Sequence, residues 1–292
     1  MSPPTTSQKD DPKTYSFYLT QRFNADNTRY IIRDSEGQIY WGLQTRPIQI
    51  ISRLSRNDIA LLPRKPLDAT QFFPTFDPET MTKFEPSMHS RADVFVKKQA
   101  LLNSPNFMYR PKRYYDLTMH ELQVGEQLAK DPHPHLCRYL GVIVNPITNL
   151  VMGLAYKKYD CDLLGYFSLK KYETPRLSAE EAKMISDSVK SAVDAIHAKG
   201  FVHCDIRPPN IFLKVDSEVE ESDWDEGPSS TWKIKEVVVG DFDASLKRGA
   251  QIELKIANEW WRPASFGFGS KADFEIDNFS VARLEEWLEK KM

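Results

Sequence analysis

The stretch VHCDIRPPNIFL, residues 202–213, contains polar side chains whose types and spacing suit chemistry on a hydroxyl group. His203, Asp205 and Asn210 form the pattern His-x-Asp-x-x-x-x-Asn. A carboxylate can orient a hydroxyl or accept its proton, and oxygen atoms are the ligands that Mg²⁺ prefers. The stretch therefore predicts a loop in which a hydroxyl group is activated beside a metal ion.

Three further residues complete the set that phosphate transfer from ATP requires. Lys97 lies in a strand-like pattern, Glu121 in a helical pattern, and Asp241 in the sequence Asp-Phe-Asp. In such chemistry a lysine holds the phosphates, a glutamate holds the lysine, and an aspartate binds Mg²⁺. Each residue alone is more often a solvated surface group, so their joint order predicts an ATP- and Mg²⁺-dependent phosphotransferase. Lys98 is the alternative to Lys97, because the register of the strand is open.

The elements before this loop are predicted from β-formers and apolar periodicity. Residues 14–62 are rich in β-formers, and five prolines in 63–90 predict an irregular connection. ADVFVKK predicts a short strand and HELQVGEQLAK a helix, and CRYLGVIVN with NLVMGLAY predicts a buried hairpin. This half of the chain is therefore expected to be mostly strands with one helix.

The elements around and after the loop are mostly helical. Ser178 and Glu181 have the spacing of a capping box and predict a helix over 178–199, which Gly200 ends. NIFLKV and IKEVVVGDF predict two strands, joined by an acidic stretch over 216–226. Apolar residues repeat on one face of a last helix, at positions 281, 284 and 288. The order predicts an α+β, two-lobed arrangement.

Composition limits the class of protein and its environment. The 292 residues are 41% hydrophobic and 27% charged, as in a globular protein. No apolar run approaches the roughly 20 residues of a membrane span, and the net charge of −2 argues against nucleic acid as a partner. The N-terminal residues lack the apolar core of a secretory signal, and the cysteines lack paired spacing. We therefore expect an intracellular, cytoplasmic protein.

Together these motifs carry a resemblance to a known family. The segment 94–288 resembles a protein kinase and is similar, more narrowly, to compact divergent kinase-like proteins of filamentous fungi. In that group HxDLxPxNI, DFDS and a terminal ND…ALxxIxxWL recur, and this chain has HCDIRPPNI, DFDAS and IDNFSVARLEEWL. The resemblance implies a two-lobed protein kinase-like fold with a truncated C-terminal lobe and an N-terminal β-rich extension.

The resemblance also implies a division of the chain. Residues 1–14 are expected to be a disordered lead-in, and residues 15–90 a β-rich extension that merges into the small lobe. Residues 91–292 are expected to form the kinase-like domain, with the small lobe reaching about residue 155 and the large lobe spanning 160–292.

Residue roles follow from the resemblance as expectations. Asp205 is expected to be the catalytic base or the residue that orients the hydroxyl, and Arg207 stands where Ser/Thr kinases carry a lysine near the γ-phosphate. Lys97 is expected to bind the α- and β-phosphates and to pair with Glu121. Asn210 and Asp241 are expected to bind Mg²⁺, and His203 to brace the loop.

The chain departs from the family pattern at four places. Cys204 replaces the arginine that binds a phosphorylated activation segment, so no phosphate switch is expected. Asp243 replaces a glycine and is either a further metal ligand or a solvated turn residue. The glycine-rich phosphate loop is missing, and its candidate segment, 51–62, contains no glycine, although Ser55 and Asn57 are possible substitutes. Phe95 is expected to be a bulky neighbour for adenine if Lys97 faces the nucleotide.

Three functions remain open on the sequence. The first is an ATP- and Mg²⁺-dependent protein kinase, of the serine/threonine type, acting on an unknown protein. The second is a pseudokinase that serves as a binding module or scaffold. The third is a small-molecule phosphotransferase resembling aminoglycoside or choline kinases, although the glycine that usually follows their histidine is absent here.

Overall fold

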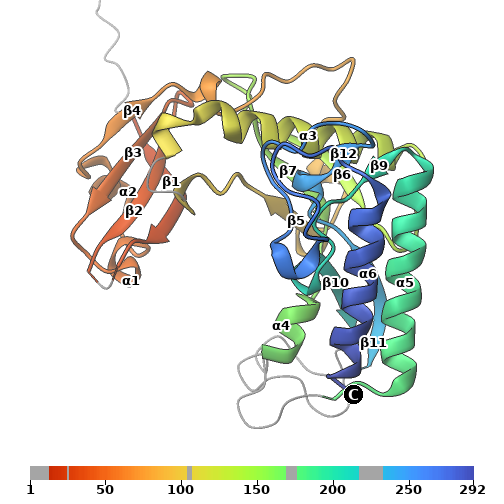
Figure 1. Ribbon diagram of the computed structural model, residues 1–292. Coiled ribbons are helices and arrows are strands. Elements are labelled where there is room, and N and C mark those ends of the chain that lie inside the picture. The colour runs from red at the N-terminus through yellow and green to blue at the C-terminus, as the bar shows by residue number, and fades with distance from the viewer. Residues whose placement is uncertain (1–12, 25, 104–106, 169–175, 217–232) are drawn as a thin grey trace, which may run out of the picture. The chain divides into compact units, whose positions relative to one another are not determined.

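The computed structural model describes residues 13–24, 26–103, 107–168, 176–216 and 233–292 (Figure 1). The predicted lead-in, apart from its last residues, and the predicted acidic stretch, apart from its first residue, lie outside the described residues. By contacts the chain divides into two units. Unit 1 comprises residues 1–75, 100–114 and 145–150, and unit 2 comprises residues 76–99, 115–144 and 151–292.

This division crosses the predicted one. The segments 100–114 and 145–150 belong to unit 1 by contacts, although the sequence-based division counts them with the kinase-like domain. The functional division at residue 90 stays a prediction.

Unit 1 contains a four-stranded antiparallel sheet with the strands in chain order. Its elements are β1 Tyr15–Arg22, β2 Thr28–Asp34, β3 Ile39–Gln44, α1 Ile48–Ile51, α2 Arg56–Ala60 and β4 Lys65–Leu67. A tight turn joins β2 to β3: the Asp34 carboxylate accepts the backbone N–H groups of Glu36 and Gln38, and Gly37 has a φ of 85°. Buried side chains of β2 and α2 pack into a small core of their own.

Unit 2 begins with a three-stranded sheet and the helix beside it. The strands are β5 Val94–Lys97, β6 Tyr139–Val144 and β7 Val151–Lys157, in the order β5-β7-β6. Helix α3, Pro111–Ala129, starts among residues counted with unit 1 and continues into unit 2. A Cβ on Gly125 of α3 would lie 3.0 Å from ring carbons of Tyr139, so the absence of a side chain there lets α3 approach β6 closely. Strands β6 and β7 pair antiparallel, which confirms the predicted hairpin.

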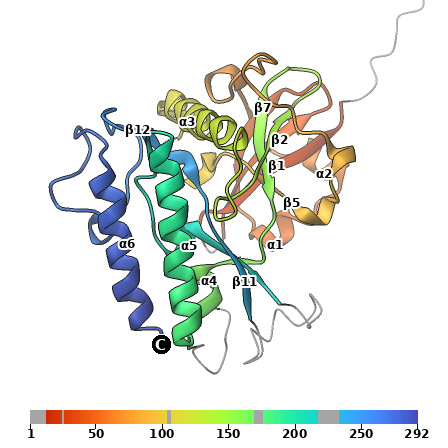
Figure 2. The same ribbon diagram turned by 90° about the vertical axis from the view of Figure 1, so that its right-hand side faces the viewer.

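The rest of unit 2 is dominated by two long helices, α5 Ala179–Ala198 and α6 Phe274–Glu289, which lie side by side (Figures 1 and 2). The predicted capping box is present: Ser178 Oγ accepts the Glu181 N–H at 3.1 Å, and the Glu181 carboxylate accepts the Ser178 N–H at 2.9 Å. Gly200, with a φ of 74°, reverses the chain after α5.

Short strands, one short helix and 3-10 turns complete the described residues. The described elements are β8 Cys161–Asp162, α4 Leu163–Ser168, β9 Phe201–Val202, β10 Ile211–Val215, β11 Ile234–Val239 and β12 Leu246–Lys247. The described 3-10 turns are η1 Ala69–Gln71, η2 Pro86–Met88, η3 Arg91–Asp93, η4 Leu101–Asn103, η5 Phe107–Tyr109, η6 Pro208–Asn210, η8 Phe242–Ala244 and η9 Glu259–Trp261. None of the helices among the described residues has the length and apolarity to cross a membrane.

Candidate active site

Two residues of the site, one in the loop after β9 and one after β11, have an uncommon backbone conformation. Cys204 has a φ of 63° and Asp241 a φ of 62°, both in the left-handed region that non-glycine residues seldom adopt. Such conformations persist only where surrounding contacts hold them. The carboxylate of Asp277, on α6, accepts the backbone N–H groups of His203 at 2.7 Å and Cys204 at 2.8 Å. Helix α6 therefore anchors the start of the loop.

Asp277 was not singled out from the sequence, although a signal was available. Its side chain is fully buried and also lies 2.8 Å from His197 Nε2. It occupies the apolar face of α6, beside Ile276 and one turn before Val281. A charged residue on the buried face of a helix must have partners, so this position could have been identified from periodicity.

His203 braces the loop from inside. Its Nδ1 accepts the backbone N–H of Asp205 at 3.3 Å, so Nε2 carries the proton and donates to the Gly240 carbonyl at 3.0 Å. The imidazole also packs against the ring of Phe242, with 5.5 Å between centroids. These contacts connect the loop to the segment that carries Asp241.

Asn210 lies beside Asp205, as the spacing requires. Its Nδ2 donates to the Asp205 carbonyl at 2.7 Å and to Asp205 Oδ2 at 3.0 Å. Its own carbonyl accepts the Gly240 N–H at 3.0 Å, next to Asp241. The structure thus brings Asp205, Asn210 and Asp241 together at one end of β10 and β11.

Lys97 reaches the same place from β5. Its Nζ lies 2.8 Å from the Glu121 carboxylate and also contacts Asp241 Oδ1. The Tyr156 hydroxyl donates to Glu121 Oε1 at 2.9 Å, which holds the glutamate from a second side. Of the two lysines that the sequence left open, Lys97 is the one that pairs with Glu121.

Burial and charge act against each other in this group. Burial raises the pKa of Glu121 to about 7, although Lys97 lowers it in part. Burial lowers the pKa of Lys97, but the carboxylates of Glu121, Asp243 and Asp241 outweigh it and raise the pKa well above 10.5. The pKa of Asp241 lies far below its usual value, because Lys97 and Lys255 outweigh the effect of burial. Lys97 and Asp241 are therefore charged at neutral pH.

Arg207 and Asp205 form a close charge pair. Arg207 Nε lies 2.9 Å from Asp205 Oδ1, but the angle is not that of a hydrogen bond. Asp205 Oδ1 is buried and has no hydrogen-bond partner among the described residues. This carboxylate oxygen can accept a hydrogen bond from an incoming hydroxyl group.

Asp243 and Lys255, which are not part of the family pattern, also lie in this group. Asp243 is not a solvated turn residue: its side chain is 19% exposed, and its Oδ1 lies 2.5 Å from Lys255 Nζ. Lys255 Nζ also lies 3.1 Å from Asp241 Oδ2 and 3.5 Å from Asp205 Oδ2. No motif in the sequence points to Lys255, which lies in an irregular stretch.

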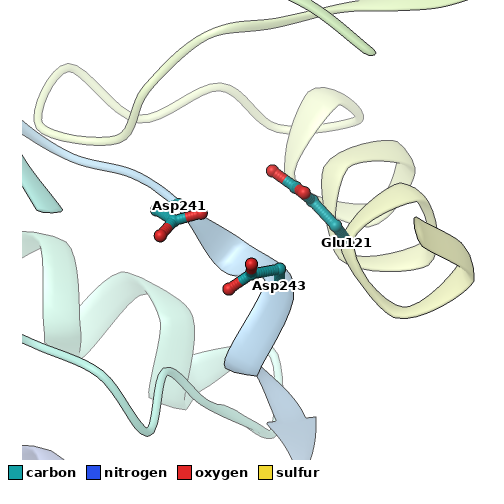
Figure 3. A group of neighbouring side chains, drawn as sticks. All are labelled: Glu121, Asp241 and Asp243. Carbon is teal, nitrogen blue, oxygen red and sulfur yellow. The ribbon is translucent and has the colours of Figure 1, made fainter. Parts of the chain in front are cut away.

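The donor set fits a divalent cation. Carboxylate oxygens of Glu121, Asp241 and Asp243 all lie within 4.8 Å of one another, the first from α3 and the other two from the segment after β11 (Figure 3). Carboxylate and amide oxygens are the ligands that Mg²⁺ prefers. Lys97 and Tyr156 engage Glu121, so the residues that would hold such an ion are Asp241, Asp243 and Asn210, and Lys255 now contacts the first two of these.

These polar groups border a cavity of about 340 Å³ within unit 2. Lys97, Glu121, Asn210 and Asp241 line part of it. Its other walls include the aromatic residues Phe95, Tyr156, Tyr159 and Phe212. The volume lies in the range of small-ligand sites, and flat rings suit a planar ligand. Phe95 shares this cavity with Lys97, as the alternation along β5 predicted.

The candidate phosphate loop over 51–62 is not a loop of the expected kind. It lies in unit 1 and contains helix α2, which Ser55 caps by accepting the Asp58 N–H at 3.2 Å. The Ser55 side chain is therefore already engaged and does not replace a glycine-rich loop. In unit 2 the described residues before β5, 76–93, form turns and 3-10 helices but no strand. No strand hairpin thus precedes β5 within the described part of unit 2.

The cysteines near this cavity are expected to resist thiol reagents. Burial raises the pKa of Cys137 and of Cys161 to about 12, and it raises the pKa of Cys204 further. At pH 8 a thiol of this pKa is ionised to a fraction of about 10⁻⁴, against about a quarter for a free cysteine, so reaction should be roughly 10³-fold slower on ionisation alone. Titration with 5,5′-dithiobis(2-nitrobenzoic acid) measures this rate. All three thiols should react at once in guanidinium chloride, and a thiol that reacts equally fast in the native protein contradicts the prediction.

Comparison with known proteins agrees with this geometry. A sequence model of the family described as "Protein kinase domain" matches residues 92–246, which is more than half of the chain. Serine/threonine-protein kinase US3 of human herpesvirus 2 (strain HG52) is 32% identical over 119 residues, covering 39% of this chain and 23% of the viral protein. Dual specificity tyrosine-phosphorylation-regulated kinase 3 of Homo sapiens is 24% identical over 169 residues, covering 58% of this chain and 26% of the human protein. The matched stretch thus spans about a quarter of the length of these relatives.

Among solved structures, the CAK complex of Chaetomium thermophilum bound to ATP-gamma-S has a chain with a TM-score of 0.47 and 14% identity. The alignment covers 95% of this chain and 62% of that one. The narrower resemblance to fungal kinase-like proteins stays a prediction. The extent of the family match decides the assignment: this chain belongs to the protein kinase domain family.

Proposed function

We propose that this chain is an ATP- and Mg²⁺-dependent phosphotransferase of the serine/threonine protein kinase type, which transfers the γ-phosphate of ATP to a hydroxyl group. One observation carries the proposal. Lys97, Glu121, Asp241 and Asn210 line a single cavity in unit 2, and Asn210 holds the Asp205 carboxylate at 3.0 Å. These are the groups that phosphate transfer requires, because its catalysis depends on positioning and on stabilising charge.

The proposed roles follow from the contacts. Lys97 binds the α- and β-phosphates, and Glu121 keeps its ammonium group in place. Asp205 orients the hydroxyl through Oδ1 and accepts its proton, while Asn210 holds Oδ2 at 3.0 Å and so fixes the carboxylate. Arg207 adds positive charge at the point of transfer, with a planar group in place of the usual ammonium. Asp241 and Asn210 hold Mg²⁺, which neutralises charge on the phosphates when it is bound.

A second candidate is a pseudokinase that binds a nucleotide or a protein without transferring phosphate. Two observations favour it. No strand hairpin precedes β5 among the described residues of unit 2, so the described part of that unit has no hairpin of the kind that carries a glycine-rich phosphate loop. Phe95, which is 53% exposed, takes up space in the cavity. Both features weaken the hold on ATP without removing a catalytic group.

Incubation of the purified protein with Mg²⁺ and γ-labelled ATP tests the proposal, together with a melting curve under the same conditions. Label on the protein itself or on a generic protein substrate supports the kinase. A rise in melting temperature without transfer supports the pseudokinase, since a ligand that binds only the native state stabilises it. ATP consumption that requires an added metabolite supports the small-molecule phosphotransferase. Neither label nor stabilisation overturns the proposed use of ATP.

A further inference from the structure

Lys255 lies at the centre of the carboxylates that the proposed function assigns to catalysis and to metal binding. Its Nζ is within 3.5 Å of oxygens on Asp243, Asp241 and Asp205. Among the described residues, Lys97 contacts Asp241 and Asp243 and Arg207 contacts Asp205, whereas Lys255 contacts all three carboxylates. Attraction from Asp243, Asp241 and Asp205 outweighs burial and raises the pKa of Lys255, so the side chain is charged at neutral pH.

The backbone around Lys255 is anchored on both sides of a short span. Ile252 is fully buried and its N–H donates to the Ser270 carbonyl at 2.9 Å. Ala257 is also buried, and its N–H donates to the Cys204 carbonyl at 2.9 Å, next to the catalytic loop. Only residues 253–256 lie between these two anchors. The side chain of Lys255 is therefore delivered to the carboxylates by a fixed backbone, while its own long stem can still rotate.

Lys255 and Asp243 form a matched addition to the site. Asp243 stands where the family pattern has glycine, so it adds a negative charge beside Asp241. Lys255 adds one positive charge, at 2.5 Å from the new carboxylate. Like charges that share a site repel unless a cation lies between them. The pair therefore leaves the net charge of the site unchanged while adding a cation among its metal ligands.

We propose that Lys255 is a tethered cation that neutralises Asp205, Asp241 and Asp243 in the metal-free protein and competes with a divalent cation for them. The inference rests on the proposed function, because it takes Asp241 to be a metal ligand. Mg²⁺ binds carboxylate oxygens at about 2.0–2.1 Å. An ion on Asp241 Oδ2 or Asp243 Oδ1 would lie next to the ammonium group that now contacts both atoms. Binding of the metal therefore requires Lys255 Nζ to leave, and rotation of its four-carbon stem is sufficient.

Binding of Mn²⁺ alone, measured by electron paramagnetic resonance without nucleotide, tests the competition. Lys255→Met removes the charge and should bind Mn²⁺ at least tenfold more tightly than the wild type. Lys255→Arg keeps the charge and should stay near the wild-type affinity. Asp241→Asn should abolish the tight site in the Lys255→Met background, which shows that the measured ion occupies this position. Lys183→Met is the matched control, because Lys183 is exposed on α5 and pairs with Asp187, away from these carboxylates. Unchanged or weaker Mn²⁺ binding by Lys255→Met overturns the proposal.

A second measurement uses the wild-type protein and does not depend on the folding of a variant. Lysines are acetylated with a water-soluble N-hydroxysuccinimide ester, with and without saturating Mn²⁺, and the modified peptides are quantified by mass spectrometry. Lys255 should become several-fold more reactive when the metal releases it, while Lys183 should not change. Equal reactivity of Lys255 in the two samples overturns the proposal.

The result can be separated from the test of the proposed function. Phosphate transfer by the wild type, with equal Mn²⁺ affinity in Lys255→Met, retains the kinase and removes the competing lysine. Tighter Mn²⁺ binding by Lys255→Met, without phosphate transfer by either protein, supports the lysine and counts against the kinase.

Discussion

Replacing Asp205 by asparagine is expected to slow phosphate transfer by about 10²- to 10⁴-fold, the usual contribution of a general base. The substituted side chain keeps almost the same shape but cannot accept the proton of the hydroxyl group. Asp205 is 1% exposed and is held by Asn210 at 3.0 Å. Because the site is buried, bulk water does not easily take over the role of the base. The rate of label transfer from γ-labelled ATP is the measurement.

The affinity for ATP should change little in the same variant, because Lys97 and Asp241 supply the proposed contacts to the phosphates and the metal. Asp187→Asn is the matched control, since Asp187 is exposed on α5 and pairs with Lys183. It should transfer label at the wild-type rate. If Asp205→Asn is as active as this control, Asp205 has no part in the chemistry.

Replacing Asp277 by alanine is expected to lower the free energy of unfolding by about 3–5 kcal/mol, the cost of breaking a buried charged contact. The change leaves the N–H groups of His203 and Cys204 without their acceptor in a fully buried place. It also removes the partner of His197. Urea denaturation followed by circular dichroism measures the loss.

A control on the same helix separates this role from helix capping. Asp273 caps the N-terminus of α6 by accepting the Glu275 N–H at 3.2 Å, and it is 38% exposed where it pairs with Arg248. Asp273→Ala should therefore cost only about 1 kcal/mol, as is usual for a lost cap. The anchoring role of Asp277 is wrong if Asp277→Ala destabilises the protein no more than Asp273→Ala does.

Both predictions concern the same loop, which Asp277 anchors and which carries Asp205. Asp277 holds the backbone at His203 and Cys204, where the chain adopts a left-handed conformation, and Asp205 follows immediately. A weaker anchor is therefore expected to affect catalysis as well as stability, because small displacements of a catalytic group are costly.

Much of unit 2 could be predicted from local patterns. The sequence predicts a helix over 178–199 from its capping box and apolar face, which the structure has as α5 Ala179–Ala198, and it predicts the hairpin of β6 and β7 from two apolar runs. These signals work because each depends on residues that are near in sequence. The family could be identified for the same reason, since His203, Asp205 and Asn210 lie within one short loop.

Other features depend on contacts between distant residues and have no local signal in the sequence. The sequence predicts a candidate phosphate loop at 51–62, but this segment contains a capped helix in unit 1. Lys255 was not predicted, because a lysine in an irregular stretch has no periodicity that shows where it points. The role of Asp277 depends on a backbone 74 positions earlier in the chain.

Motif spacing and capping are local properties, so the family, the α+β class and the set of groups available for phosphate transfer can be predicted from the residues alone. Which of these groups meet depends on the folded chain. Lys97 and Asp241, 144 positions apart, come into contact because β5 and the end of β11 border one cavity. The fold also brings Lys255 among the carboxylates of Asp205, Asp241 and Asp243, since Ile252 and Ala257 fix the backbone on either side of it. Charged groups that lie far apart in the sequence interact strongly there, because burial removes the water that would otherwise screen them.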